Sequence, residues 1–208
     1  MEIAIIGASG RTGRAVAGQA AERGEAVVAV VRNAARIEPG EAARVEVAES
    51  TDAVQVASAI NGCDAVLFCV GPVRGESATI QQDGIRAVLE AMTQTGIRRV
   101  IAISASGGVI DGDDPLSRYV AKPILARVLR DSNADMAAME ELLRNSDTDW
   151  TIMRPPRLTD GPSKGRYRER RDGNVRWHYT MRRSHLARAM LDALVDHTSI
   201  RQTIAVTD

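Results

Sequence analysis

Three glycines near the start of the chain stand between an apolar run and a helical pattern. Gly7, Gly10 and Gly13 recur at every third position, after the run Ile3–Ile6 and before Ala15–Ala17. Glycines at a strand-to-helix turn let the backbone approach phosphate groups, and the helix N-terminus offers free N–H groups and the positive end of a dipole. The turn is therefore predicted to hold the pyrophosphate of a dinucleotide. A tight turn without a ligand is the alternative, but the order of strand, turn and helix is the context that the binding motif requires.

The end of the next apolar run indicates which dinucleotide fits. In NAD sites an acidic residue usually ends the second strand and bonds the ribose hydroxyls. Here the run Ala26–Val31 ends in Arg32, a fixed cation suited to bidentate contact with phosphate. Arg11 and Arg36 are placed to add to the same pocket, although each is as readily a solvated arginine, which is also the alternative for Arg32. The pattern favours NADP (NADPH) over NAD. The cofactor-binding residues predicted in this part of the chain are Gly7, Ser9, Gly10, Arg11, Thr12, Gly13 and Arg32.

Apolar runs alternate with helical patterns along the chain, and these elements must position the turn. The predicted strands are Glu2–Ile6, Ala26–Val31, Val45–Ala48, Ala65–Val70, Val100–Ile103, Trp150–Met153 and Thr203–Val206. The predicted helices are Arg14–Arg23, Ala53–Ile60, Ser77–Thr95, Pro115–Arg130, Asp135–Asn145 and His185–Asp196. Strands that alternate with helices pair in parallel, with helices on both faces of the sheet. We therefore predict an α/β protein, a single domain over residues 1–208 with a doubly wound Rossmann fold and a mostly parallel sheet of about six to seven strands.

Residues 161–183 break this alternation. Two short strand-like runs, Gly165–Arg170 and Val175–Thr180, flank Asp172–Asn174, whose composition is typical of a hairpin turn. Insertions after the late strands of an α/β sheet usually shape a ligand site. We therefore predict a small late β-hairpin on the substrate side of the domain.

The predicted hairpin is basic and aromatic. Its Lys and Arg residues far outnumber its acids, and it carries Tyr167, Trp177 and Tyr179. Trp177 is suited to stack on a ring, and neighbouring arginines are suited to meet a phosphate or carboxylate. The arginines considered for this role are Arg168, Arg170 and Arg176. The composition suits a planar, anionic small molecule, and the alternative is a solvated strand edge whose charge discourages pairing with another chain.

Bulk properties argue against several classes of protein. The 27 basic and 27 acidic residues cancel, so nothing pulls the chain as a whole toward nucleic acid or a membrane surface. No apolar run approaches the roughly 20 residues of a membrane span, and the first apolar run is too short for a signal peptide. Cys63 and Cys69 are too few for a disulfide framework, and three scattered histidines predict no metal site. We expect a cytoplasmic protein with a small-molecule substrate and no nucleic-acid or membrane partner, and its oligomeric state stays open.

Later motifs join the glycine turn in a recognisable order. They are Gly7–Gly13, Val31–Asn33, Cys69–Pro72, Ile101–Ser106 and Trp150–Pro156. With them the chain resembles the atypical short-chain dehydrogenase/reductases, within the NAD(P)H-binding group that includes flavin reductase/biliverdin reductase B and the NmrA-like proteins. The stretch around His185 is similar to the family's late helix, which commonly has an acidic residue at that position.

The resemblance implies roles for matching positions. Gly71 would pass close to the adenosine and ribose, and Pro155 would lie near the nicotinamide. Ser104 and Ser106 follow the fifth predicted strand, where this superfamily places an active-site hydroxyl, so they are the candidate catalytic residues. Serines beside glycines also cap turns well, and that reading stays open.

One expected pair is misplaced. Typical members pair a tyrosine with a lysine four residues later, which places both on one helix face. The nearest match here is Tyr119 with Lys122, and Pro123 disfavours a helical conformation at Lys122. We therefore predict no Tyr–Lys catalytic pair, a loss that is common in the atypical group.

These residues together favour an NADPH-dependent oxidoreductase that transfers hydride to a flavin-like or other conjugated small molecule. The cofactor carries the hydride, and the protein supplies orientation and electrostatics. A proton can come from Ser104, Ser106 or solvent. The alternative is a non-catalytic, NADP-binding redox-sensing regulator of the NmrA-like type, which the missing proton relay equally permits. A sugar-nucleotide epimerase or dehydratase is a third option, but those enzymes usually need a larger C-terminal region and the tyrosine that is misplaced here.

Overall fold

The computed structural model of the protein describes residues 1–72, 77–107, 130–162, 165–171 and 173–208. Two sequence predictions lie outside these residues, namely the helix that begins at Pro115 and the Tyr119–Lys122 pair. None of the helices in the described part of the chain has both the length and the apolar content that a membrane crossing requires.

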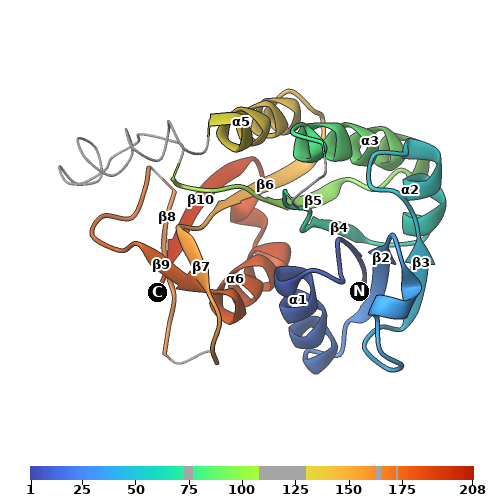
Figure 1. Ribbon diagram of the computed structural model, residues 1–208, viewed down its shortest axis with the longest axis horizontal. Helices are drawn as coiled ribbons and strands as arrows, with labels where there is room; N and C mark the ends of the chain where they lie inside the picture. Colours follow the sequence, from blue (N-terminus) through green and yellow to red (C-terminus); the bar gives the residue numbers. More distant parts are fainter. Residues whose placement is uncertain (73–76, 108–129, 163–164, 172) are drawn as a thin grey trace.

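An eight-stranded sheet forms the centre of the fold, in the order β3-β2-β1-β4-β5-β6-β10-β8 (Figure 1). Its strands in chain order are β1 (Glu2–Ile6), β2 (Ala26–Val31), β3 (Arg44–Val47), β4 (Ala65–Phe68), β5 (Arg99–Ile103), β6 (Asp149–Arg154), β8 (Arg168–Arg170) and β10 (Gln202–Thr207). All neighbours pair in parallel except β8, which runs antiparallel to β10 at the edge. The predicted doubly wound, mostly parallel α/β fold is confirmed, with eight strands in place of about six to seven.

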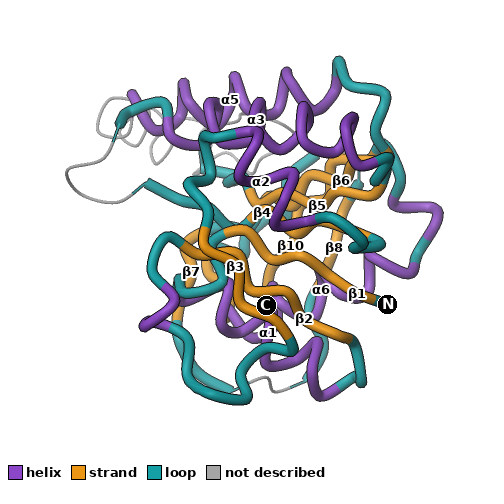
Figure 2. Tube along the Cα trace, turned by 90° about the vertical axis from the view of Figure 1, so that its right-hand side faces the viewer, coloured by secondary structure: helices purple, strands orange, loops and turns teal. Residues whose placement is uncertain are grey.

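Helices cover both faces of this sheet. Two of them pack together on one face, and these are α1 (Arg11–Glu22) and α6 (Arg183–Val195). The other face carries α2 (Ala53–Ile60), α3 (Ile80–Thr95) and α5 (Arg130–Arg144). Figure 2 shows the same arrangement from the side, with the strands between the two groups of helices. Short 3-10 helices, η1 (Ala34–Arg36) and η3 (His197–Ser199), lie in connecting loops.

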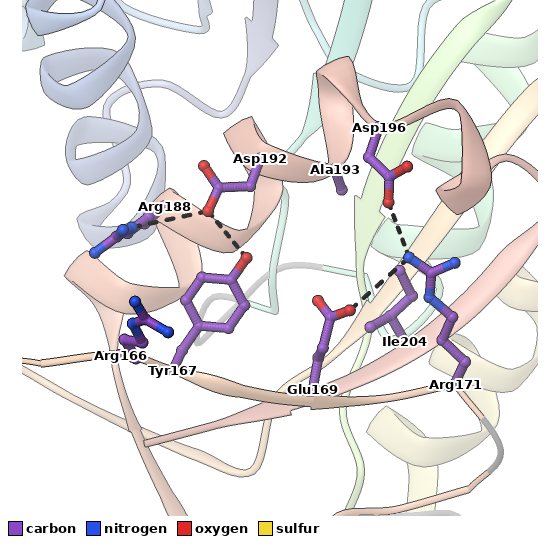
Figure 3. Close-up of a pocket in the computed structure, with 9 residues that line it drawn as sticks. All are labelled: Arg166, Tyr167, Glu169, Arg171, Arg188, Asp192, Ala193, Asp196 and Ile204. Carbon is purple, nitrogen blue, oxygen red and sulfur yellow. Dashed lines mark hydrogen bonds and ion pairs between the residues drawn. The ribbon is translucent and has the colours of Figure 1, made fainter.

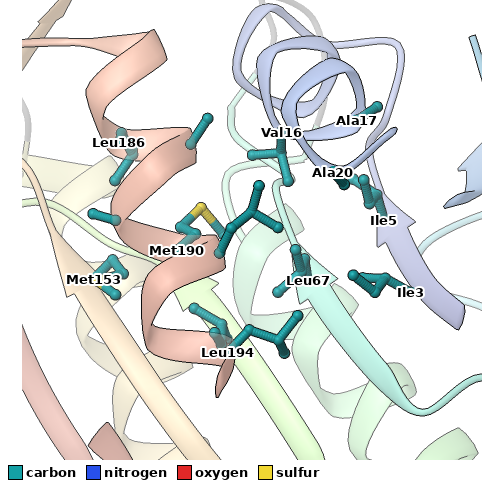
Figure 4. Close-up of a cluster of buried hydrophobic side chains, with 14 of the residues drawn as sticks. Ile3, Ile5, Val16, Ala17, Ala20, Leu67, Met153, Leu186, Met190 and Leu194 are labelled. Atoms are coloured by element: carbon teal, nitrogen blue, oxygen red, sulfur yellow. The ribbon is translucent and has the colours of Figure 1, made fainter. Parts of the chain in front are cut away.

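Alternate residues of the central strands build two separate cores. Ile3 and Ile5 of β1 face α1 and α6, where they join Met190 in one apolar cluster (Figure 4). Ala4 and Ile6 face the other group of helices and belong to a second cluster. These four β1 residues are at most 1% exposed, as expected for a parallel strand that is covered on both faces. The two cores hold β1 rigidly, and β1 leads directly into the glycine turn.

Local capping sets the helix boundaries. The first helix, α1, begins at Arg11, ahead of the predicted start at Arg14, because Gly10 takes the extended conformation of an N-cap (φ −74°, ψ 160°). At the end of α3, Gly96 is the C-cap and has a left-handed φ of 76°, which a glycine adopts without strain.

The start of α3 is capped from a neighbouring helix. The buried carboxylate of Asp135, on α5, accepts hydrogen bonds from the backbone N–H groups of Gln81 (3.0 Å) and Gln82 (2.8 Å). A side chain from another helix therefore accepts the hydrogen bonds that an N-cap residue usually accepts. This bond fixes α5 against the N-terminal end of α3, where Ile80 begins the helix.

The predicted hairpin within residues 161–183 is wrong. β8 pairs with β10, whereas β9 (Thr180–Arg182) pairs in parallel with β7 (Arg157–Thr159), so these two segments do not pair with each other in the described residues. Residues 175–179 form no strand, and Trp177 has a left-handed φ of 63° that a strand does not contain. The physical reason is that the edge of β10 offers β8 a partner in an existing sheet, while an isolated two-stranded hairpin is marginal in water.

Candidate cofactor and active site

A cavity of about 140 Å³ lies at the carboxyl ends of β1, β2 and β4. We call it the turn cavity. Its lining residues are Ile6, Gly7, Ser9, Gly10, Val30, Val31, Arg32, Arg36, Ala48, Ser50, Cys69, Val70, Gly71 and Ile80. The strand order reverses at β1, which lies between β2 and β4, and ligands of open α/β sheets bind at such a switch point.

The glycine turn owes its shape to close backbone packing. Gly7 has a left-handed φ of 84°, and a β-carbon there would lie 3.1 Å from the carbonyl oxygen of Cys69. A β-carbon on Gly13 would lie only 2.3 Å from the carbonyl oxygen of Gly7. Larger residues at these two positions would push β4 and α1 away from the turn. The glycines thus bring the start of α1 directly against the end of β1.

The N-terminus of α1 opens on this turn without a side-chain cap. Gly10 is the N-cap and offers no side-chain acceptor, and residues 11–14 contain no acid. The first N–H groups of a helix lack intrahelical partners and carry the positive end of the helix dipole. Backbone donors that meet no internal anion suit a bound phosphate group, so the turn fits the pyrophosphate of a dinucleotide.

Two of the three arginines considered for the cofactor line the turn cavity. Arg32 follows β2 and Arg36 ends η1, and both are exposed. Arg11 is not among the lining residues, and its guanidinium lies 3.5 Å from the carboxylate of Asp160. The lining residues include no Asp or Glu, so this part of the described structure presents cations and backbone N–H groups to a ligand.

The other predicted cofactor residues divide between the cavity and its support. Ser9 and Gly71 line the turn cavity. Thr12 and Gly13 do not line it, and Gly13 is buried behind the turn in contact with Gly7. Pro155 is also buried, and it lies farther along the sheet, beyond the end of β6.

The ends of β5 and β6 bring the two candidate serines beside Pro155. The backbone N–H of Ser104 donates to the carbonyl of Met153 (2.8 Å), and that of Ser106 donates to the carbonyl of Pro155 (2.9 Å). The two segments therefore stay paired beyond their strands. Ser106 is partly exposed, whereas Ser104 is only 6% exposed.

A buried charge cluster occupies the space behind Ser104. Arg154 at the end of β6 donates two hydrogen bonds to the Glu140 carboxylate, from Nε (2.8 Å) and Nη2 (2.5 Å). Arg144 donates a third at 2.7 Å, and the Ser104 hydroxyl also bonds to Glu140. Burial alone would raise the pKa of the Glu140 carboxyl, but the hydrogen bonds from Arg154 and Ser104 lower it below its ordinary value. Glu140 is therefore an anion at neutral pH.

A second cavity of about 210 Å³ adjoins this cluster. We call it the β5–β6 cavity, and its lining residues are Ser104, Ala105, Asn133, Met136, Ala137, Glu140, Arg144 and Arg154. It lies at the same carboxyl edge as the turn cavity, with β4 and β5 adjacent in the sheet. Sequence reasoning assigned no role to Glu140, because its partners lie on other elements and no local pattern connects them.

A cavity of about 470 Å³ lies between α6 and the β8 segment, away from this edge (Figure 3). Its acids are already paired, since Asp192 accepts from Tyr167 (2.9 Å) and Asp196 from Arg171 (2.8 Å). Burial and Asp192 raise the pKa of Tyr167. The hydrogen bond to Asp192 directs the Tyr167 hydroxyl toward α6, whereas Trp177 is 60% exposed.

The histidines and acids of the described segments form no cluster of metal-ligating side chains. Among the residues that the structure describes, no three His, Cys, Asp or Glu side chains gather closely enough to hold a metal ion. His185 is 1% exposed and its Nδ1 lies 2.6 Å from Asp208. The Nδ1 of His178 lies 2.7 Å from the carbonyl oxygen of Arg176.

Comparison with known proteins decides the family. A family model described as NAD(P)H-binding matches residues 7–197. The chain belongs to this NAD(P)H-binding family. The match begins at the first glycine of the turn and extends through α6, so it includes all lining residues of the β5–β6 cavity and all those of the turn cavity except Ile6. The resemblance to the atypical short-chain dehydrogenase/reductases is thereby confirmed.

One sequence relative and two solved structures are similar to this chain over nearly its whole length. A UPF0659 protein of Schizosaccharomyces pombe is 29% identical over 224 residues, which cover 98% of this chain and 88% of the relative. A short-chain dehydrogenase/reductase of Veillonella parvula, solved in complex with NADP, superposes with a TM-score of 0.84 at 19% identity and covers 100% of this chain and 94% of its own. ChuY, an anaerobilin reductase of Escherichia coli O157:H7, has a TM-score of 0.83 at 20% identity, with 100% and 97% covered.

Proposed function

We propose that this member of the family is an NADPH-dependent reductase that passes hydride to a planar, conjugated and anionic small molecule. The observation that carries the proposal is the pairing of Arg32 and Arg36 with the glycine turn in one cavity, whose lining includes no acid among the described residues. NADPH supplies the hydride when bound. The chain's own residues would hold, orient and select it.

The cofactor half of the proposal rests on charge. An NAD site offers a carboxylate to the ribose hydroxyls, which would repel the additional phosphate of NADP. Arg32 and Arg36 instead offer guanidinium groups, which bind phosphate through paired hydrogen bonds. The neighbour from Veillonella parvula holds NADP in the same fold. Ser9 and Gly10 would then receive the pyrophosphate at the start of α1.

The substrate half rests on the β5–β6 cavity. It adjoins Ser104, and the cluster behind it contains two arginines against one glutamate, so the part of its wall that the structure describes carries a net positive charge. Such a wall suits an anionic acceptor. Ser106 is partly exposed and is the more available of the two hydroxyls for proton donation, with solvent as the other source. The neighbour ChuY is an anaerobilin reductase, so a bilin belongs among the acceptors to test.

The test is NADPH oxidation, followed by its absorbance, with FMN, riboflavin and a bilin as acceptors. We expect turnover with at least one of them, and slower turnover when NADH replaces NADPH. Equal rates with NADH and NADPH would contradict the role given to the two arginines. Tight NADPH binding without oxidation of any acceptor would contradict the reductase and leave the cofactor site intact.

One observation favours a second candidate, an NADP-binding redox-sensing regulator. Ser104 is only 6% exposed and its hydroxyl helps to lower the pKa of the neighbouring Glu140 carboxyl, so its proton is poorly available to a substrate. A protein that only binds NADP needs no such proton. The regulator is distinguished from the reductase by NADP binding together with the absence of turnover across the acceptor panel and a protein partner that co-purifies with the chain.

A further inference from the structure

We propose that Arg14 is a positioning residue for NADPH selectivity, which holds the loop bearing Arg32 and Arg36 in register with the glycine turn. The inference rests on the proposed preference for NADPH and adds a residue that no motif assigns. Arg14 would not touch the cofactor. It would act through the backbone of Ser9 and Arg36, both of which line the turn cavity.

Arg14 bonds to both sides of the turn cavity from one side chain. Its Nε donates to the carbonyl of Ser9 within the glycine turn (3.2 Å), and its Nη2 donates to the carbonyl of Arg36 at the end of η1 (2.5 Å). Its Nη1 also lies 3.8 Å from the carboxylate of Glu41. Ser9 and Arg36 are far apart along the chain, so this guanidinium joins two segments that the fold alone would only bring near each other.

The hydrogen bonds that shape the loop on the far side of this bond are short-range, and Ile37 also packs against the apolar cluster beside α1. Asn33 caps η1 by accepting from the N–H of Ala35 (3.0 Å), and Ile37 closes it by donating to the carbonyl of Ala34 (3.0 Å). Bonds of this kind fix the shape of the loop but not its distance from another element. The Arg14 hydrogen bond to Arg36 supplies that second restraint.

Arg14 itself lies outside the turn cavity. It lines a separate small cavity beside Ala8, Ala17 and Ile37, on the α1 side of the turn. Its donors are directed at two backbone carbonyls, which are acceptors that a guanidinium can satisfy together because its N–H groups form a rigid fork. A lysine has one nitrogen and cannot hold both carbonyls in the same geometry. Position 14 therefore requires the two directed donors of an arginine, and a positive charge alone is not sufficient.

The expected consequence is selective. Arginines that are already in place bind a phosphate without first being ordered, and loss of that order weakens binding. NADH lacks the phosphate that Arg32 and Arg36 are proposed to bind, so it gains little from their placement. Loss of the Arg14 bonds should therefore weaken NADPH binding much more than NADH binding.

The experiment measures Kd for NADPH, NADH and 2′,5′-ADP by isothermal titration calorimetry on the full chain. Arg14→Met keeps the hydrocarbon part of the side chain and removes its donors. We expect Kd for NADPH and 2′,5′-ADP to rise about tenfold or more, which is the range for losing a hydrogen bond from a charged group, and Kd for NADH to change less than about threefold. Arg14→Lys should fall between Arg14→Met and the wild type.

The matched control is Arg23→Met at the other end of α1, where Arg23 pairs with Asp192 on α6 (2.8 Å). It removes one exposed arginine from the same helix and should leave all three Kd values unchanged. If the wild type binds NADPH and NADH equally, the proposed function fails together with this inference. If the wild type prefers NADPH but Arg14→Met keeps the same ratio, or if both Kd values rise in parallel, Arg14 is only structural and this inference alone is overturned.

Discussion

The contact between α1 and the glycine turn predicts opposite effects for one substitution at two positions of the same helix. Gly13→Ala places a β-carbon 2.3 Å from the Gly7 carbonyl oxygen and 2.8 Å from the Cα of Ala8. Gly18→Ala places one where no atom lies within 4 Å. Both changes replace a helical glycine by alanine, so the difference between their free energies of unfolding measures the effect of the close packing between α1 and the turn.

The magnitudes follow from these contacts. At Gly13 both neighbours are backbone and cannot rotate away, so α1 must move by about 0.7 Å or more to reach a 3.0 Å contact. Overpacking of this kind costs about 1–3 kcal/mol, and the gain in helix propensity offsets at most about 1 kcal/mol of it. We expect Gly13→Ala to lower the free energy of unfolding by about 1–2 kcal/mol, which lowers Tm by about 2–8 °C in a domain of this size. We expect Gly18→Ala to raise the free energy of unfolding by about 0.5–1 kcal/mol.

Two assays check this pair. Thermal unfolding of the wild type and both variants gives the signs, and calorimetric titration with NADPH shows whether the turn has moved. Gly13→Ala should also weaken NADPH binding, because Gly7 and Ala8 belong to the turn, and Gly18→Ala should bind like the wild type. A Gly13→Ala protein as stable as Gly18→Ala and with undiminished NADPH affinity would refute the close packing of the turn.

Three further predictions concern single side chains. Arg32→Ser should raise Kd for NADPH about tenfold or more while changing Kd for NADH little, measured by calorimetry, because a charge-assisted bond to phosphate is lost. Glu140→Gln should lower the free energy of unfolding by about 3–5 kcal/mol in urea titrations, since Arg154 is left buried without its anion. The pKa of Glu140 is lowered in the folded state, so its ionised carboxylate adds to the free energy of unfolding at pH values above the unfolded pKa of about 4.3. This stabilisation is lost as the pH falls through the folded pKa. The difference in free energy of unfolding between the wild type and Glu140→Gln should therefore become smaller in acid. Asp135→Ala should lower the free energy of unfolding by about 1–2 kcal/mol through loss of the cap on α3, whereas Asp135→Asn should retain part of it.

The sequence predicted the first half of the fold closely, because local patterns determine it. The predicted ranges of β1 and β2, Glu2–Ile6 and Ala26–Val31, match the structure. Both strands are covered on two faces, so nearly every position in them is apolar and the run can be recognised from consecutive residues. The glycine turn and Arg32 are local in the same sense, and the structure places them in one cavity.

The later segments escaped prediction because their partners are distant in the chain. β8 pairs with the edge of β10 and not with the segment that follows β8 in the chain. An alternating pattern predicts a strand but does not predict which strand it pairs with. The acceptors of the Arg14 hydrogen bonds are backbone carbonyls, which every residue has, so no sequence pattern predicts these bonds. Glu140 meets Arg154 and Ser104 only after α5 docks on the sheet.

We propose that the turn cavity selects NADPH through Arg32 and Arg36. This selectivity is tested most directly by calorimetric titration of the wild-type protein with NADPH and NADH at one fixed, low ionic strength, where charge interactions are least screened. We predict that NADPH binds at least about tenfold more tightly, the range expected for charge-assisted bonds to one additional phosphate. Equal affinity for the two cofactors, or tighter binding of NADH, would contradict it.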